Sequence, residues 1–507
     1  MASRNINVHP TGYHPSLLAE TTFDIIIIGG GPVGNFAEGR LAKAGLSVAV
    51  IQHELYGGEC HFFGCIPSKA LLRPVEALEA AKKVGGAREA VGSKTVVDHN
   101  AVFNRRDKIV DNWDDNNWIS VSNGSSGAKL VRGFARIEGT RRVSVQPNGE
   151  TQRYMLDARI AVVAATGSTP IVPEIAGIEE LIPGKELWIN RDAVAFDKVP
   201  ESLIIVGAGP VGCEMATFYS AVGSKVTLIT PHAEILATVE REATEIVRKS
   251  LEAHGVSVKL STRAVKVKKV AANSLAVELS NGEQITGSVL MNAVGRRPRT
   301  HDFGLETVGL AGGGLPLKTD ASLAVQTPGS TEPWLFAVGD VNGLGSTTHM
   351  GVYQARIASN TILSIAKKQD QAAKLDLPTG VSVTKSKHLD STFPRVIFTE
   401  PNIAAVGHTL ASAQTAGLKA KAVDSNFSIP GTWLYGDEQP GWARWVVEEG
   451  TEKLLGATFC CIEGSEFANA SQVAIMQGMA LTDMVHVVPP FPTRGEVWTY
   501  LLNAAGY

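Results

Sequence analysis

The pattern of apolar residues near the start of the chain predicts a strand, a glycine-rich turn, a helix and a second strand. The run "FDIIII" at 23–28 is almost wholly apolar, which is typical of a strand buried on both faces. The turn "GGGPVG" follows it, a helix is expected from Asn35 to Ala44, and "LSVAVIQ" at 46–52 has the composition of a second buried strand. This order of elements begins the parallel sheet of an α/β protein.

The same pattern recurs in the middle of the chain. The stretch "LIIVGAGPVGCEMATFYSAVGSKVTLIT" begins at Leu203 and again predicts strand, glycine turn, helix and strand, so the chain carries two nucleotide-binding units. Between them lies a more polar region with "NGSSG" at 123–127 and β-like runs. The polar segment 365–388 is a candidate domain boundary, and the elements expected after about Leu389 predict a separate α+β domain.

Each unit has three glycines in the spacing G-x-G-x-x-G directly after its first strand. The first glycine allows a tight turn, the second lets the backbone approach a pyrophosphate, and the third lets the helix pack closely on the strand. The helix N-terminus then offers N–H donors and a partial positive charge. These expected phosphate cradles are Gly29, Gly31 and Gly34 in the first unit, and Gly207, Gly209 and Gly212 in the second.

The residues after each second strand bear on which dinucleotide is bound. In the first unit Gln52 and Glu54 stand where a ribose-binding carboxylate is expected, although Glu54 could equally be a solvated loop residue. In the second unit Thr230 and His232 occupy that region, with no acid to mark NADH and no arginine to mark a 2′-phosphate. The missing carboxylate favours NADPH, but the choice between NADH and NADPH stays open.

Composition narrows the possible partners. The chain has 507 residues, 44% of them apolar, and a formal net charge of −3, which gives no electrostatic footprint for nucleic acid or an anionic membrane. No apolar run is long enough to span a bilayer, and the first 20 residues lack the apolar core of a secretory signal. We therefore expect a cytoplasmic protein with no nucleic acid, membrane or metal partner. Five cysteines are too few for a disulfide scaffold.

Two of these cysteines lie close together, in "GGECHFFGCIPSKALLRP" at 57–74. Residues five apart on a straight helix are too far apart for a disulfide, so Cys60 and Cys65 could bridge only if the backbone bends, which Gly64 could permit. Pro67 suits the first turn of a helix, which would place Cys65 near a helix N-terminus, where a thiol pKa falls. Two inert buried thiols remain possible on spacing alone. We interpret Cys213 and the vicinal pair Cys460–Cys461 as structural.

Taken together, the motifs resemble those of the pyridine nucleotide-disulfide oxidoreductases, the family of dihydrolipoamide dehydrogenase, glutathione reductase and mercuric reductase. The resemblance runs from about Phe23 to the C-terminus and rests on "GGGPVG", "GGECHFFGCIPSKALL", "ATGSTP", "GAGPVGCE", "AVGRRP", "FAVGDV" and "FTEP" in order, with "GGEC" in place of the commoner "GGTC". It implies an α/β protein with two Rossmann-like domains and a C-terminal α+β dimerisation domain. The expected divisions are an N-terminal extension at 1–22, an FAD-binding domain at 23–172 and 293–368, an NAD(P)-binding domain at 173–292 and an interface domain at 389–507.

The resemblance also implies roles for single residues. FAD should bind the first cradle and NADH or NADPH the second, with Lys69 beside the flavin and Glu214 as the ion-pair partner of Lys69. Cys65 should face the flavin as a thiolate, and Cys60 should exchange with an external disulfide. The further cofactor contacts expected are Gly58, Ala135, Thr166, Gly167, Ser168, Gly295, Asp340, Thr348 and His349.

The C-terminus departs from the family pattern. Disulfide-reducing members carry His-Pro-Thr followed by a glutamate, and the histidine transfers protons at the partner's exchange thiol. Here Pro492, Thr493 and Glu496 keep the pattern, but Phe491 stands in the place of the histidine and cannot transfer a proton.

Three functional readings therefore stay open. The first is a homodimeric enzyme that passes electrons through the cysteine pair to an unidentified small acceptor, with Glu496 in its catalytic machinery. The second is a reductase of quinone or oxygen that acts directly from flavin. The third is an assembly protein without turnover, against which the intact cradles and cysteines argue.

Overall fold

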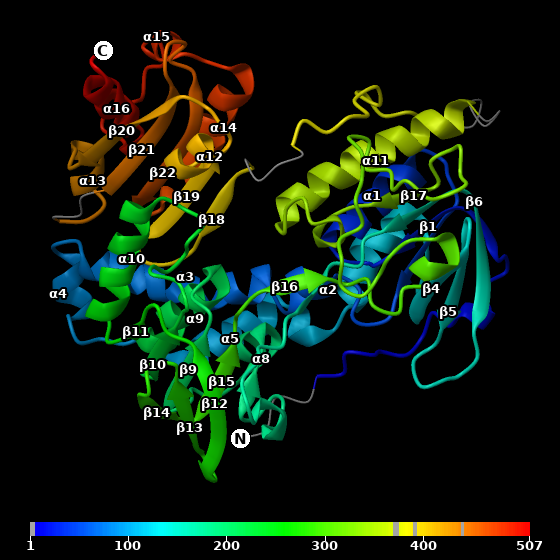
Figure 1. Ribbon diagram of the computed structural model, residues 1–507, viewed down its shortest axis with the longest axis horizontal. Coiled ribbons are helices and arrows are strands. Elements are labelled where there is room, and N and C mark those ends of the chain that lie inside the picture. The colour runs from blue at the N-terminus through cyan, green and yellow to red at the C-terminus, as the bar shows by residue number, and fades with distance from the viewer. Residues whose placement is uncertain (1–5, 369–374, 389–392, 438–440) are drawn as a thin grey trace.

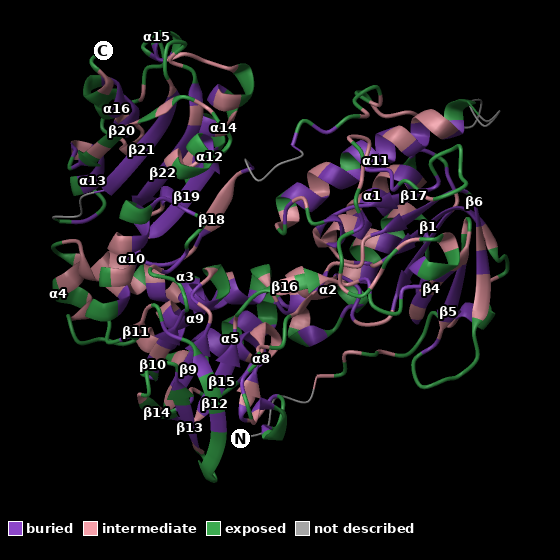
Figure 2. Cartoon of the chain, in the orientation of Figure 1, coloured by how far each residue is buried: buried purple, intermediate pink, exposed green. Residues whose placement is uncertain are grey.

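The computed structural model describes residues 6–368, 375–388, 393–437 and 441–507, and within these ranges the chain forms three sheet-based units (Figure 1). One unit, on the right of the view, holds the N-terminal strands. The second lies at the lower left of centre, and the third, which contains the C-terminus, lies above the second. Buried strands form the core of each unit, and the outer faces of the covering helices are exposed (Figure 2). Among the described residues, no helix has the length and apolar character needed to cross a membrane.

The first unit is built on a seven-stranded sheet in the order β3-β2-β1-β6-β5-β4, with β17 paired to β6. Pairing is parallel around β1 and antiparallel between β4, β5 and β6. Alternate residues of β1 enter separate cores, and helices α1 and α11 cover the face that holds Ile25 and Ile27. The strands are β1 (Thr22–Ile28), β2 (Val48–Gln52), β3 (Lys129–Arg132), β4 (Phe134–Gly139), β5 (Arg142–Gln146), β6 (Tyr154–Ala164) and β17 (Leu335–Ala337).

Helix α1 (Pro32–Lys43) begins three residues earlier than the sequence analysis expected. Gly31 is its N-cap and Pro32 is its first residue, a position that suits proline because the missing N–H would have no partner there. Helix α11 (Thr348–Lys368) runs into the polar segment that we considered a boundary. The described residues 375–388 of that segment pack on the first unit, where the Asn360 side chain donates to two of their carbonyls.

The second unit contains a parallel five-stranded sheet in the order β11-β10-β9-β15-β8 and an antiparallel sheet of β12, β13 and β14. Strands β7 (Ser168–Pro170) and β16 (Arg296–Pro298) pair between the two units. The other elements are β8 (Leu187–Trp188), α8 (Asn190–Ala195), β9 (Ser202–Val206), α9 (Pro210–Ala221), β10 (Lys225–Ile229), α10 (Arg241–Ala253), β11 (Ser257–Lys259), β12 (Ala264–Ala271), β13 (Ser274–Leu279), β14 (Gln284–Gly287) and β15 (Val289–Asn292).

The more polar region between the two repeats contains strands β3 to β6, in keeping with its β-like runs, but the part before β3 is mostly helical. The "NGSSG" segment lies in helical turns, since Asn123 ends the π-helical turn η3 (Ile119–Asn123) and α7 (Gly124–Ser126) follows. The long helix α3 packs against both α5 and α9 and so connects the first two units. The helices are α2 (Gly58–Phe62), α3 (Cys65–Lys82), α4 (Ala87–Val91), α5 (His99–Ile109) and α6 (Asn116–Trp118).

The third unit is an antiparallel sheet in the order β18-β19-β22-β21-β20, flanked by helices. Cys460 and Cys461 are both buried and enter different cores, as expected for neighbours on a strand. The elements are β18 (Arg395–Ile397), β19 (Asn402–Gly407), α12 (Leu410–Thr415), β20 (Ala420–Phe427), α13 (Pro430–Trp433), β21 (Gly441–Glu448), β22 (Leu454–Cys461), α14 (Phe467–Gln477), α15 (Leu481–Met484) and α16 (Val497–Ala505).

Candidate active site

A cavity of about 670 Å³ lies where the three units meet. Its walls come from the first cradle, from the N-terminal end of α3, from α9 of the second unit and from β18 of the third. Both cysteines of the pair line this cavity, together with Lys69 and Glu214. One space therefore joins both nucleotide-binding units to the cysteine pair.

The first glycine cradle leaves room for a ligand because side chains are excluded from it. Gly29 has φ +110°, and a Cβ there would lie 2.2 Å from the carbonyl oxygen of Ala165. A Cβ on Gly34 would lie 1.9 Å from the Gly29 carbonyl oxygen, and one on Gly58 would lie 2.9 Å from the Cα of Gly31. With the N-terminus of α1 beginning here, the cradle fits the pyrophosphate of a dinucleotide.

Gln52 and Glu54 both line the cavity, but their side chains have protein partners. Gln52 accepts a hydrogen bond from the Gly30 N–H at 2.7 Å and donates to the Leu55 carbonyl at 3.2 Å. Glu54 pairs with Arg191 at 2.6 Å. Burial opposes ionisation of Glu54, but the hydrogen bonds and charge of Arg191 outweigh it and lower the pKa to about 2.

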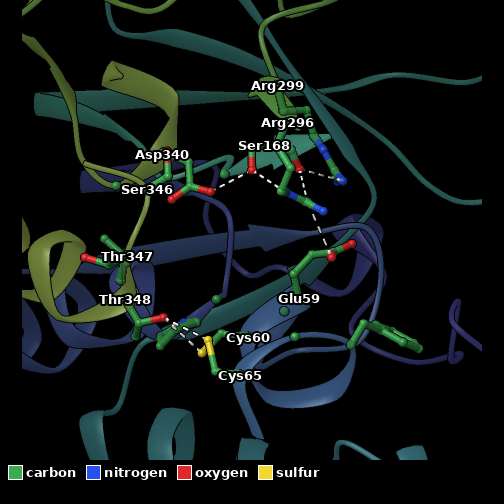
Figure 3. Close-up of a pocket in the computed structure, with 18 of the residues that line it drawn as sticks. Glu59, Cys60, Cys65, Ser168, Arg296, Arg299, Asp340, Ser346, Thr347 and Thr348 are labelled. Atoms are coloured by element: carbon green, nitrogen blue, oxygen red, sulfur yellow. Dashed lines mark hydrogen bonds and ion pairs between the residues drawn. The ribbon is translucent and has the colours of Figure 1, made fainter. Parts of the chain in front are cut away.

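A polar network crosses the cavity near the first cradle (Figure 3). Ser168 donates to Asp340 at 2.6 Å and accepts from Arg296 at 2.8 Å, and Arg296 also lies 3.4 Å from Glu59. Glu59, the unusual residue of "GGEC", forms an ion pair with Arg191 as well. Glu59, Arg191 and Arg296 are site residues that the sequence motifs did not predict. Ala135, Thr166 and Gly167, expected near FAD, line the same cavity.

The cysteine pair sits at a break between two helices. Helix α2 ends at Phe62, Gly64 takes a non-helical conformation, and Cys65 begins α3, so the bend that a disulfide between the two cysteines would require is present. Both cysteines are free thiols in this structure. The Thr348 hydroxyl donates to the Cys60 sulfur at 3.0 Å and lies 3.4 Å from the Cys65 sulfur (Figure 3).

The two thiols differ in acidity. The hydrogen bond that Cys60 donates lowers the pKa of Cys65 to about 6 against the opposing effect of burial, with help from the Thr348 hydroxyl and the Lys69 charge. The same hydrogen bond, with burial, raises the pKa of Cys60 well above its usual value. The two shifts run in opposite directions, so Cys65 is the more acidic thiol of the pair and Cys60 the less acidic one.

Lys69 and Glu214 lie beside the pair. The Lys69 ammonium, one turn after Cys65 on α3, is 2.7 Å from the Glu214 carboxylate on α9. Glu214 also accepts the Phe398 N–H at 3.1 Å, and Lys69 lies 4.7 Å from the centre of the Phe398 ring. This contact fixes the first two units and the start of the third around the cavity.

The second cradle repeats the geometry of the first. Gly207 has φ +109°, and a Cβ on Gly212 would lie 1.9 Å from the Gly207 carbonyl oxygen. Gly209 is the N-cap of α9. Thr230 is buried and accepts the His232 N–H at 3.3 Å, but neither residue lines the cavity. Gly295 lies outside it too, with its carbonyl bonded to the Ile171 N–H at 3.0 Å.

No histidine of the described residues hydrogen-bonds either sulfur of the pair. His61 stacks on Trp118 with ring centres 4.6 Å apart, and the His349 ring bonds the Pro394 carbonyl at 2.7 Å. Phe491 is 75% exposed and, like Glu496, lies on the third unit away from the cavity of its own chain.

Comparison with known proteins identifies the family. The model of the pyridine nucleotide-disulphide oxidoreductases matches residues 23–359, and the model of their dimerisation domain matches residues 393–502. The chain belongs to this family. The predicted family and the predicted α/β fold with a C-terminal dimerisation domain are thus confirmed, and so is the expectation of an oxidoreductase that uses FAD and NAD(P)H.

Dihydrolipoyl dehydrogenases are among the curated members of the family that this chain resembles. Those of Chlorobaculum tepidum and Thermus scotoductus are each 30% identical to it, over 94% of this chain and 95% of theirs. Among solved structures, a Cu(II) complex of the HOCl-induced flavoprotein disulfide reductase RclA from Escherichia coli has a TM-score of 0.79. It is 22% identical over 96% of this chain and 99% of its own, which bears on the fold alone.

Proposed function

We propose that this chain forms a homodimeric FAD enzyme that passes electrons from NADH or NADPH through Cys60 and Cys65 to a small-molecule disulfide. The single observation that carries the proposal is the cysteine pair bridged by the Thr348 hydroxyl, in a cavity lined by the first cradle and by α9, the helix that follows the second cradle. The similarity to dihydrolipoyl dehydrogenases supports a substrate of this class, and the dimerisation domain supports the homodimer.

The overall reaction is NAD(P)H + H⁺ + RSSR → NAD(P)⁺ + 2 RSH. When bound, FAD supplies the two-electron relay between the nicotinamide and the cysteine pair. The proposed cofactor contacts are those named above from the sequence, with the first cradle and Asp340 assigned to FAD and the second cradle to NAD(P)H.

The cysteine pair itself provides the base that Phe491 does not. Cys60 gives its proton to the adjacent Cys65 thiolate, attacks one sulfur of the acceptor and displaces RS⁻, so that a mixed disulfide forms on Cys60. Cys65 then loses that proton to solvent and displaces the second RS⁻ as the Cys60–Cys65 disulfide closes. Two electrons have then left the pair, and both displaced thiolates take their protons from water.

The missing histidine restricts which acceptors are efficient. A positioned acid at the departing sulfur typically contributes about 10²–10⁴-fold, and among the described residues no histidine hydrogen-bonds the cysteine pair to act as one. We therefore propose an acceptor whose thiolate leaves readily, because its thiol has a low pKa.

The test compares Cys60→Ser with Cys213→Ala, which removes a buried thiol outside the cavity. Each purified yellow enzyme is assayed for NADH and NADPH oxidation with 5,5′-dithiobis(2-nitrobenzoate) and with menadione. We expect Cys60→Ser to abolish disulfide reduction and Cys213→Ala to retain it.

Full disulfide activity in Cys60→Ser would refute the proposal. Turnover of menadione alone, unchanged by Cys60→Ser, would instead support direct reduction of quinone or oxygen from flavin. A colourless protein that cannot bind FAD would support the assembly role.

A further inference from the structure

Arg395 is an unpaired cation in the wall of the cavity that holds the cysteine pair. It is the first residue of β18, and among the described residues no carboxylate lies within ion-pair distance of its guanidinium. Its Nε atom is buried and has no hydrogen-bond partner there. Arg395 as a whole is half-buried, and a cation that loses part of its hydration without gaining a partner is costly, so a protein usually retains one only where a ligand or partner compensates it.

The acidic residues in the cavity wall do not compensate Arg395, because each already has its own partner. Glu54 and Glu59 pair with Arg191, and Glu59 also with Arg296. Glu214 pairs with Lys69, and Asp340 accepts the Ser168 hydroxyl. A negative group for Arg395 must therefore come from outside these walls.

The position of Arg395 separates it from the expected phosphate sites. A second cation without a carboxylate partner in the described chain, Arg299, lies at the cradle end, where its carbonyl accepts the Thr166 hydroxyl at 2.9 Å. Arg395 lies at the cysteine end. It directly follows Pro394, whose carbonyl is hydrogen-bonded to the His349 ring. Thr348, the residue before His349, donates to the Cys60 sulfur. Dinucleotide phosphates belong at the cradles, so the charge that meets Arg395 belongs to the reacting acceptor.

We propose that Arg395 binds a carboxylate of the acceptor, and hence that the acceptor is an anionic disulfide. This rests on the proposed function above, and the redox step is the one written there, in which two RS⁻ leave as the Cys60–Cys65 disulfide forms. A guanidinium suits this task because it binds a carboxylate through two parallel N–H···O bonds.

The first test measures charge preference with two disulfides that both release thiols of low pKa. The holoenzyme is assayed with anionic 5,5′-dithiobis(2-nitrobenzoate) and neutral 4,4′-dithiodipyridine. A hydrogen-bonded charge pair corresponds to about 10- to 100-fold in affinity. We expect Arg395→Gln to lower the ratio of kcat/KM for the anionic to the neutral substrate by about that factor, mainly through KM, and Arg395→Lys to restore part of it.

Arg299→Gln is the matched control, and we expect it to weaken FAD binding, measured by flavin fluorescence, without changing that ratio. The proposal is overturned if the wild-type enzyme shows no preference for the anionic disulfide. It is also overturned if Arg395→Gln lowers kcat/KM equally for both disulfides. Weaker FAD binding in Arg395→Gln would overturn it too, because that result would assign Arg395 to the cofactor.

A second measurement does not depend on turnover. The reduced holoenzyme is alkylated with anionic iodoacetate and with neutral iodoacetamide, and modification of Cys65 is followed by mass spectrometry. We expect Arg395→Gln to lower the iodoacetate-to-iodoacetamide rate ratio several-fold, and an unchanged ratio contradicts the anion site. If the ratio falls but no disulfide is reduced, the anion site stands and the proposed function fails.

Discussion

Replacing Thr348 with valine should raise the pKa of the Cys65 thiol, because valine keeps the shape of threonine and removes its hydroxyl. That hydroxyl lies 3.4 Å from the Cys65 sulfur and 3.0 Å from the Cys60 sulfur. The hydroxyl has one hydrogen, which it can turn from Cys60 to the Cys65 thiolate; a hydrogen bond to a charged group contributes about 1.5–3 kcal/mol, and the long distance to Cys65 places this one at the low end. Since about 1.4 kcal/mol corresponds to one pKa unit, the pKa of Cys65 should move from about 6 to about 7.

The assay is the rate of iodoacetamide alkylation of Cys65 in the reduced enzyme as a function of pH. At pH 6.5 the thiolate fraction, and therefore the rate, should fall about threefold in Thr348→Val, and above pH 8.5 the two enzymes should react alike. Thr347→Val is the matched control, because the neighbouring hydroxyl lies 3.1 Å from the His349 ring and bonds neither sulfur. An unchanged midpoint in Thr348→Val, or an equal shift in Thr347→Val, would refute the reasoning.

Three further predictions concern proton transfer and the first cradle. Phe491→His should increase turnover of aliphatic disulfides, whose thiolates leave slowly, by up to about 10²-fold, and no gain in steady-state rate would mean that the pocket excludes them. Because the pKa of Cys65 is lowered to about 6, its reactive thiolate is present above that pH and disulfide turnover should fall as the pH drops through 6; a rate that stays level down to pH 5 would contradict this. Gly34→Ala should abolish FAD retention on gel filtration, because its Cβ would lie 1.9 Å from the Gly29 carbonyl oxygen, whereas Gly39→Ala on the same helix meets nothing within 4 Å and should retain the cofactor.

Local chemistry explains what the sequence predicted well. Glycine spacing fixed the expectation of two cradles, because only glycine tolerates the close backbone approaches at Gly34 and Gly212. Helix geometry showed that Cys60 and Cys65 could bridge only across a bend, and the break between α2 and α3 supplies one at Gly64. The start of α1 was misplaced although Pro32 at its first position was a usable signal.

Contacts between distant segments explain what the sequence did not predict. Glu54 and Glu59 both pair with Arg191, which lies more than a hundred residues away in the sequence and belongs to no motif. Arg395 carries no local signal at all, because its importance depends on which carboxylates reach it after folding. The roles of Thr230 and His232 stay predictions, as the cavity does not extend to them.

If the proposed function holds, Phe491 and Arg395 place independent limits on the acceptor. Without a histidine to protonate it, the departing sulfur must be stable as a thiolate, which favours a thiol of low pKa. A carboxylate near that sulfur has the opposite effect, because a like charge raises the thiol pKa. Binding of the carboxylate to Arg395 offsets this effect, so the arginine would both hold the acceptor and ease the departure of its thiolate. It follows that Arg395→Gln should change the charge preference and Phe491→His the dependence on leaving-group pKa, and that the two changes should be separable in the double variant.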